Sequence, residues 1–206
     1  MQIITRAVAI ENLKKYVGKD LRALALQHGI TTYETGKQNK GWKGLILEIL
    51  AGLKTNVSKA PNGLTYELKS VSFHHVKDKL VPKETMAITM INPEELKAHS
   101  FFESHCWAKL KTLVFCAVMW HGKNAEKAEL LQVTSLDFSE TDDLILEIKA
   151  DYDLIRNKLV TQGFQALTGS DGKWIQARTK GAGHGSTSRA FYARKELVTK
   201  IFEAAK

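Results

Sequence analysis

The sequence predicts a single mixed α/β domain, and three stretches of its 206 residues indicate this class. Residues 64–73 (LTYELKSVSF) alternate apolar and polar side chains, as a half-buried strand does. Residues 113–120 (LVFCAVMW) form a continuous apolar run, which is typical of a strand buried on both faces. Residues 141–160 carry apolar side chains at helical spacing and an acidic outer face, which predicts a long amphipathic helix.

The first third of the chain is expected to be helical before the first strand begins. Residues 10–28 show helical spacing that Gly18 and Asp20 interrupt, which predicts two short helices ending before Gly29. Residues 41–52 (GWKGLILEILAG) predict an apolar helix of about three turns. The cluster SKAPNG at residues 58–63 then predicts a turn.

The remaining elements are expected to alternate between strands and helices. A helix is predicted from Pro93 to about Lys109, and another closes the chain. Further strands are expected at residues 85–91, 130–133, 173–178 and 190–193. Because the sequence contains no internal repeat and only three prolines, we interpret residues 1–206 as one domain.

The bulk composition predicts a soluble cytoplasmic protein with an anionic partner. The opening residues lack the apolar run of a signal peptide, and no segment approaches the roughly 20 apolar residues that span a bilayer. The net charge is +8. Eight of the basic residues follow Asp171, whereas residues 139–153 carry six acids against one lysine. DNA, RNA and a membrane surface all remain possible partners on charge alone, as does a merely solvated basic surface.

The two cysteines, Cys106 and Cys116, are too few for a disulfide framework. Each lies in an apolar stretch, so we interpret both as buried free thiols. A zinc site that also uses His105 or His121 is the alternative, although no cysteine or histidine pair recurs at zinc-ligand spacing.

The chemistry-bearing pattern is a helix glutamate, a turn, and a strand that carries Glu-x-Lys. Glu67 and Lys69 are two apart on the predicted strand, so they point to the same face. Glu48 lies among apolar helix residues, where a carboxylate is costly to bury, so a functional role for it is indicated. Carboxylates from a helix and a strand suit a hard divalent cation, and an adjacent lysine can hold or deprotonate a water aimed at a phosphate. A solvated charge pair is the alternative interpretation of Glu-x-Lys.

These residues, with several others in the same order, resemble the MutH family of PD-(D/E)xK nucleases. The resemblance begins with the helical segment 13–29 and extends over nearly the whole chain. It is carried by Lys40-Gly41-Trp42-x-Gly44-x-x-Leu47-Glu48, Glu67-Leu68-Lys69, Ser104-His105-x-Trp107-x-Lys109-Leu110-Lys111, Gln176-x-Arg178-x-Lys180 and Arg189-x-Phe191-Tyr192-x-Arg194-Lys195. It implies a restriction-endonuclease-like mixed sheet flanked by helices, with a catalytic N-terminal lobe and a DNA-reading C-terminal lobe around a DNA cleft.

The resemblance also implies roles for individual residues. Glu48, Glu67 and the residue at position 62 would hold Mg²⁺ or Mn²⁺. Lys69 would position the water, and Lys109 would lie near the scissile phosphate. Lys40 and Gly41 would touch the DNA backbone. The residues matched to the DNA-reading elements are Arg178, Lys180, Arg189 and Tyr192. Arginine suits guanine edges or phosphate, and lysine suits phosphate; Tyr192 could equally be a partly buried core aromatic.

The glycine-rich segment 181–188 lacks the Gly-Lys-Ser/Thr ending of a nucleotide-binding loop. We interpret it as a loop near DNA. There His184 would contact a base edge or phosphate, or would simply be a solvated histidine.

The sequence departs from the family pattern at Asn62, which follows Pro61 where the family has aspartate. No aspartate occurs between Asp20 and Asp78, so no local shift of the alignment restores it. An amide offers a neutral carbonyl oxygen instead of an anion, which should weaken metal binding and slow the reaction. Either Asn62 replaces the aspartate of an active parent enzyme, or the protein reads DNA without cutting it.

Three hypotheses about function follow from these patterns. The first is a sequence-specific Mg²⁺-dependent endonuclease on duplex DNA, with GATC as the site the resemblance implies, in repair or restriction. It would act as a monomer or DNA-induced dimer, and an activating repair protein is a further partner. The second is a catalytically inactive, sequence- or methylation-specific DNA-binding module, and the third a general polyanion binder. The acidic helix is interpreted as a solvated face, or more weakly as a docking site for that repair protein.

Overall fold

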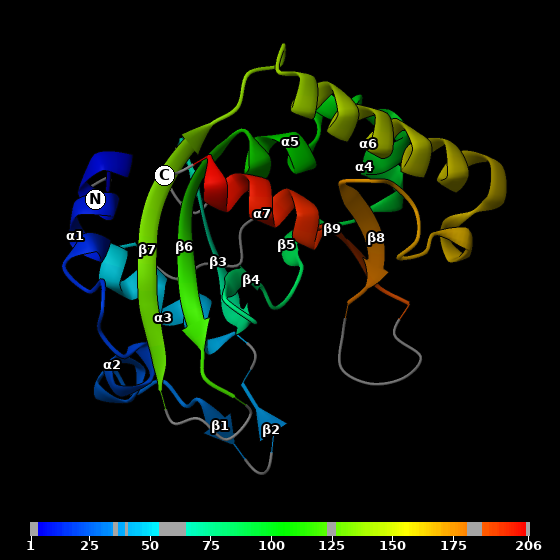
Figure 1. Ribbon diagram of the computed structural model, residues 1–206. Helices are drawn as coiled ribbons and strands as arrows, with labels where there is room; N and C mark the ends of the chain where they lie inside the picture. The colour runs from blue at the N-terminus through cyan, green and yellow to red at the C-terminus, as the bar shows by residue number, and fades with distance from the viewer. Residues whose placement is uncertain are drawn as a thin grey trace.

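A computed structural model describes residues 4–34, 37–39, 41–53, 65–122, 127–180 and 187–204. Its centre is a four-stranded sheet in the order β4-β3-β6-β7. The inner strands β3 (Glu67–Val76) and β6 (Thr112–Trp120) are parallel, while β4 (Lys79–Pro82) and β7 (Ala128–Asp137) pair antiparallel at the edges. Helices cover both faces (Figure 1), which confirms the predicted restriction-endonuclease-like α/β class.

The N-terminal helices pack on one face of this sheet. They are α1 (Arg6–Lys14), α2 (Leu21–Gln27) and α3 (Trp42–Ala51). The side chains of Thr5 and Asp20 accept hydrogen bonds from the first turns of α1 and α2, which explains why these two short helices begin where they do. The apolar faces of the three helices form one core with Leu68 of β3 and with apolar residues of β6 and β7.

The opposite face carries the later helices (Figure 1). They are α4 (Pro93–Ala98), η1 (Phe101–Glu103), α5 (His105–Leu110), α6 (Asp143–Gln162), η2 (Phe164–Ala166) and α7 (Lys195–Glu203). The prediction of one helix from Pro93 to Lys109 is wrong, because His99 has an extended backbone. Ser104 is also extended, and its hydroxyl accepts from the Trp107 amide to begin α5. The break matters for the site, since it sets the direction of α5.

A second sheet of three antiparallel strands, in the order β5-β9-β8, lies beside the later helices. It contains β5 (Met86–Met90), β8 (Ile175–Thr179) and β9 (Arg189–Ala193). The start predicted for β8 is two residues early, because the Lys173 and Trp174 amides donate to the buried Asp151 carboxylate before pairing begins. Gly172 directly precedes these hydrogen bonds and has a φ of 78°. A Cβ at this position would lie 2.1 Å from the Ile175 carbonyl oxygen, so the turn requires glycine.

Two further features were not expected from the sequence. Strand β4 forms a hairpin with β3, and the short strands β1 (Tyr33–Glu34) and β2 (Lys37–Gln38) pair with each other. The predicted buried thiols are confirmed: Cys106 and Cys116 are free and buried, and burial raises the pKa of Cys116 to about 12. Among the described helices, none has both the length and the apolar character needed to cross a bilayer.

Candidate functional site

Glu67 and Lys69 form a buried ion pair at the start of β3. Their side chains lie on the same face of the strand, as the Glu-x-Lys spacing predicts, and Lys69 Nζ is 2.8 Å from Glu67 Oε1. The exposed fraction is 3% for the Glu67 side chain and 16% for that of Lys69. A solvated surface pair is therefore the wrong interpretation of these two residues.

Lys109 joins this pair from the last turn of α5. Its Nζ donates to the same oxygen, Glu67 Oε1, at 3.2 Å, and its side chain is 12% exposed. The structure thus brings together three residues that are separated by up to 42 positions in the sequence. Two ammonium groups share one carboxylate, so this charged cluster (Glu67, Lys69 and Lys109) carries more positive than negative charge among its own side chains.

Burial, above all, lowers the pKa of Lys69. Burial lowers the pKa of its ammonium, Glu67 raises it, and the positive charges of Lys109 and Lys180 lower it further. Lys69 Nζ also donates to the Ile88 carbonyl at 3.1 Å, which fixes the direction of the amine. An amine that loses its proton more readily than ordinary lysine is suited to accept one from water.

Glu48 lies on α3, where its side chain is partly buried. Asn62 lies outside the described residues, as do Lys40 and His184. Among the residues that the structure describes, no three histidine, cysteine, aspartate or glutamate side chains gather closely enough to hold a metal ion. A metal site made by Glu48, Glu67 and the segment of Asn62 therefore stays a prediction.

Arg178 and Tyr192 come together on the second sheet. The Arg178 guanidinium carbon lies 5.5 Å from the centroid of the Tyr192 ring, in a cation–π arrangement. Burial raises the pKa of the Tyr192 hydroxyl, and the charge of Arg178 lowers it. Tyr192 is half-buried and Arg178 is exposed, so the pair presents polar groups at the surface of the sheet.

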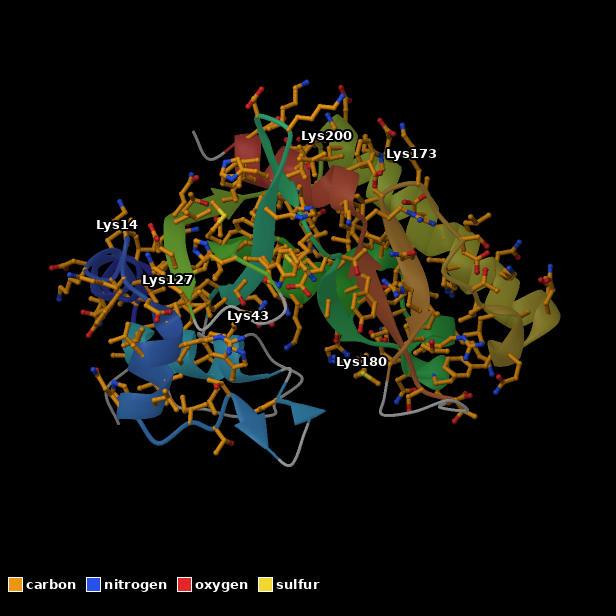
Figure 2. The ribbon with its side chains drawn as sticks, turned by 60° about the horizontal axis from the view of Figure 1, so that its bottom comes forward. Lys14, Lys43, Lys127, Lys173, Lys180 and Lys200 are labelled. Atoms are coloured by element: carbon orange, nitrogen blue, oxygen red, sulfur yellow. The ribbon has the colours of Figure 1, made fainter. Side chains whose placement is uncertain are left out.

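Lys180 connects this sheet with the charged cluster. It directly follows β8, and its amide donates to the Ser188 carbonyl at 2.8 Å. Lys69 Nζ donates to the Ile88 carbonyl of β5, which belongs to the same sheet as β8, and the charge of Lys180 contributes to lowering the pKa of Lys69. Figure 2 shows Lys180 at the end of β8 and Lys43 on the side of α3. Two groups of predicted residues, catalytic and DNA-reading, are therefore neighbours in the structure.

Two other predicted DNA contacts have intramolecular partners here. Arg189 is 7% exposed, and its guanidinium donates to the carbonyls of Leu167, Gln165 and Thr187. The Gly41 amide donates to Asn39 Oδ1 at 3.1 Å, just before α3. These bonds give Arg189 a role in holding η2 against β9, and its contact with DNA stays a prediction.

Sequence reasoning missed a second lysine–glutamate pair, which lies on the other face of β3. Lys43 donates to Glu84 Oε1 at 3.0 Å and also to the Ser72 hydroxyl, and the Ser72 amide donates to the same Glu84 oxygen at 3.3 Å. Burial raises the pKa of Glu84, but Lys43 and the Ser72 hydrogen bonds lower it more, so that the pKa lies below its ordinary value. The one signal in the sequence was Ser72, a polar residue between Val71 and Phe73.

The family model described as DNA mismatch repair enzyme MutH matches residues 54–149, which include β3 and α5. The chain is 24% identical over 199 residues to DNA mismatch repair protein MutH of Salmonella typhi, which is 96% of this chain and 84% of that protein. It is 26% identical over 194 residues to the protein of the same name from Escherichia coli O17:K52:H18, which is 93% of this chain and 81% of that one.

Proposed function

We propose that this chain, which is similar to MutH proteins over nearly its whole length, is a DNA mismatch repair endonuclease, or descends from one, that hydrolyses a phosphodiester in duplex DNA. The observation that carries the proposal is the charged cluster of Glu67, Lys69 and Lys109. Burying two lysine amines against one carboxylate is costly for folding, and such clusters are typical of functional sites. A polyanionic substrate suits a pair of lysines placed in this way.

Within the cluster, each side chain has a distinct part in the proposed reaction. Lys69 holds the attacking water and takes its proton, since burial has lowered the pKa of its amine. Lys109 lies on the other side of Glu67 Oε1, from where its ammonium stabilises the charge that develops on the phosphate. Ile88 holds Lys69 in place through its carbonyl.

Glu67 and Glu48, with a carbonyl oxygen of Asn62, are the groups that would hold a divalent cation. Mg²⁺ or Mn²⁺ takes oxygen ligands of this kind, and when bound it supplies charge compensation at the phosphate and at the leaving oxygen. The buried Glu67 carboxylate suits this part. The described residues provide fewer than three such donors in one place, so the segment around Asn62 has to complete the set.

Sequence specificity is assigned to the second sheet. Arg178 and Tyr192 would read base edges in the major groove, and Lys180 would bind a phosphate beside the charged cluster. We propose GATC as the site, with an activating repair protein as a second partner. One charged cluster on each chain fits nicking of one strand by a monomer, or cutting of both by a DNA-induced dimer.

Asn62 decides whether this chain cuts. Replacing the anionic ligand by a neutral amide weakens the hold on a dication, so we expect catalysis in this chain to be reduced by orders of magnitude. The retained Glu48, Glu67 and Lys69 favour an active parent. The alternative function is a DNA-binding module without catalysis, which the neutral residue at position 62 favours.

The test compares this chain with its Asn62→Asp variant on plasmids whose GATC sites are unmethylated, hemimethylated or fully methylated, in the presence of Mg²⁺. We expect the variant to nick or cut while the parent chain only binds. If neither form cuts and both bind one sequence tightly without needing a divalent ion, the protein is a reader and the catalytic assignments are wrong. If neither discriminates among duplexes, it is a general polyanion binder.

A further inference from the structure

The outer face of the second sheet carries a row of side chains that crosses all three strands. In the register of the sheet Gln176 pairs with Tyr192, and Tyr192 pairs with Ala87 of β5. Arg178 is two residues along β8 from Gln176, so it shares the face of Tyr192. Thr85 directly precedes β5 and reaches the same face through its hydrogen bond with Arg178. The inner face, by contrast, is buried in the core.

The side chain of Arg178 spans this row. Its guanidinium passes over the Tyr192 ring, and Nη1 donates to the Thr85 hydroxyl at 3.1 Å. Its stem lies against Gly169, where a Cβ would come within 3.3 Å of Arg178 Cγ. An exposed arginine is therefore held along its stem, over its plane and at its tip.

This hold leaves most of the guanidinium available. Among the described residues, Thr85 is the acceptor that the Arg178 head group meets. A guanidinium has five N–H donors in a fixed plane, and two of them match the O6 and N7 acceptors of guanine. Fixing that plane before binding removes rotamer freedom that the complex would otherwise have to restrict.

We infer that Thr85 is a positioning residue for sequence recognition: its hydroxyl sets the plane of Arg178 over Tyr192 so that the guanidinium meets a guanine edge. The inference rests on the proposed function, and it adds a residue directly before β5 that lies outside the charged cluster and would act without touching the DNA. Thr85 would act through Arg178, so its loss should weaken recognition of guanine and leave phosphate contacts unchanged.

Glu84 provides a matched control, because it is adjacent to Thr85 and has a partner on another element. Its carboxylate binds Lys43 of α3, whereas the Thr85 hydroxyl binds Arg178 of β8. A change at Glu84 disturbs the same connection between β4 and β5 without removing the acceptor of Arg178.

The experiment measures the affinity of the full chain for a short duplex with one GATC site, in Ca²⁺, and for the same duplex with 7-deazaguanine at both guanines of the site. The analogue lacks the N7 acceptor and keeps O6. We expect the parent chain to lose about tenfold in affinity on the analogue. Thr85→Val should bind the natural site about fivefold more weakly and lose less than twofold on the analogue. Thr85→Ser and Glu84→Gln should both behave like the parent.

Several outcomes would overturn the inference. A full loss on the analogue in Thr85→Val would show that Arg178 needs no help from Thr85. An equal reduction in Glu84→Gln would assign the effect to the connection rather than to the hydroxyl. If the parent chain binds the GATC duplex no better than a scrambled duplex, the proposed sequence specificity is wrong and the inference fails with it. This outcome differs from the two above, in which the parent chain still prefers the GATC duplex and only the role of Thr85 is wrong. Circular dichroism and the salt dependence of binding to the scrambled duplex verify that each variant is folded and keeps its phosphate contacts.

Discussion

Strand β3 carries a lysine–glutamate assembly on each of its two faces, and the two differ in charge balance. On one face Lys69 and Lys109 share the carboxylate of Glu67. On the other, Lys43 alone meets Glu84. The Glu67 side chain is 3% exposed and that of Glu84 is 47% exposed.

We interpret the Glu67 assembly as a functional site and the Lys43–Glu84 pair as a structural ion pair. The Lys43–Glu84 pair is balanced, partly solvated and completed by Ser72, so it links α3, β3 and the end of β4 without surplus charge. Among the described side chains, the Glu67 assembly brings two lysines to one carboxylate where little water reaches them. Buried charge in excess of its partner is costly to fold, and such positions gather at functional sites. The comparison predicts opposite responses when equivalent residues on the two faces are changed.

The largest difference is expected in catalysis. In the Asn62→Asp background, Lys69→Met should slow plasmid nicking by about 10²–10⁴-fold, because the group that holds the water and takes its proton is gone. Lys43→Met, its counterpart on the opposite face, should change the rate less than about threefold. Single-turnover nicking measures both. Equal losses in the two variants would show that the faces do not differ in function.

The same strand shows how far sequence reasoning reaches. The common direction of Glu67 and Lys69 follows from the two-residue period of a strand, and it was predicted. Lys109 was included through the resemblance, because no local pattern links it to a residue 42 positions earlier. Its approach to Glu67 depends on where α5 begins, and a helix continuous from Pro93 would have placed it differently.

The residues that were missed are those whose partners depend on tertiary packing. Glu84 and Thr85 are adjacent in an ordinary polar connection, yet one binds Lys43 of α3 and the other Arg178 of β8. No periodicity marks such a pair, since the partners are distant in the sequence and come together only in the folded chain. Arg189 shows the converse: a basic residue near the reading elements whose guanidinium is engaged by backbone carbonyls.

The second prediction concerns folding stability. Glu67→Gln leaves two buried ammonium groups without their carboxylate, so we expect it to lower the free energy of unfolding by about 3 kcal/mol. Glu84→Gln removes a partly solvated pair and should cost only about 0.5–1 kcal/mol. Urea denaturation at pH 7 compares them. A smaller loss at Glu67 than at Glu84 would contradict the assignment of surplus charge to the first face.

The third prediction uses a divalent cation. In the Asn62→Asp background, Mg²⁺ at about ten times its dissociation constant should stabilise the fold by about 1.4 kcal/mol through binding to the native state. Adding Glu67→Gln should abolish this gain, whereas adding Glu84→Gln should leave it intact. The shift of the thermal midpoint with added Mg²⁺ provides the measurement. A gain that survives Glu67→Gln would place the ion elsewhere.

The smallest expected effect is the pH dependence of the Glu84 pair. Its folded pKa lies below the ordinary value of 4.5, so the unfolded chain binds the proton more tightly. The pair therefore stabilises the protein above that value, and this contribution is lost as the pH falls through the folded pKa. Glu84→Gln removes the titrating group, so the stability difference between parent and variant should shrink from at most about 1 kcal/mol at pH 7 toward zero as the pH falls below the folded pKa. A difference that stays constant with pH would mean that packing of the Glu84 stem, rather than its charge opposite Lys43, supports this face of β3.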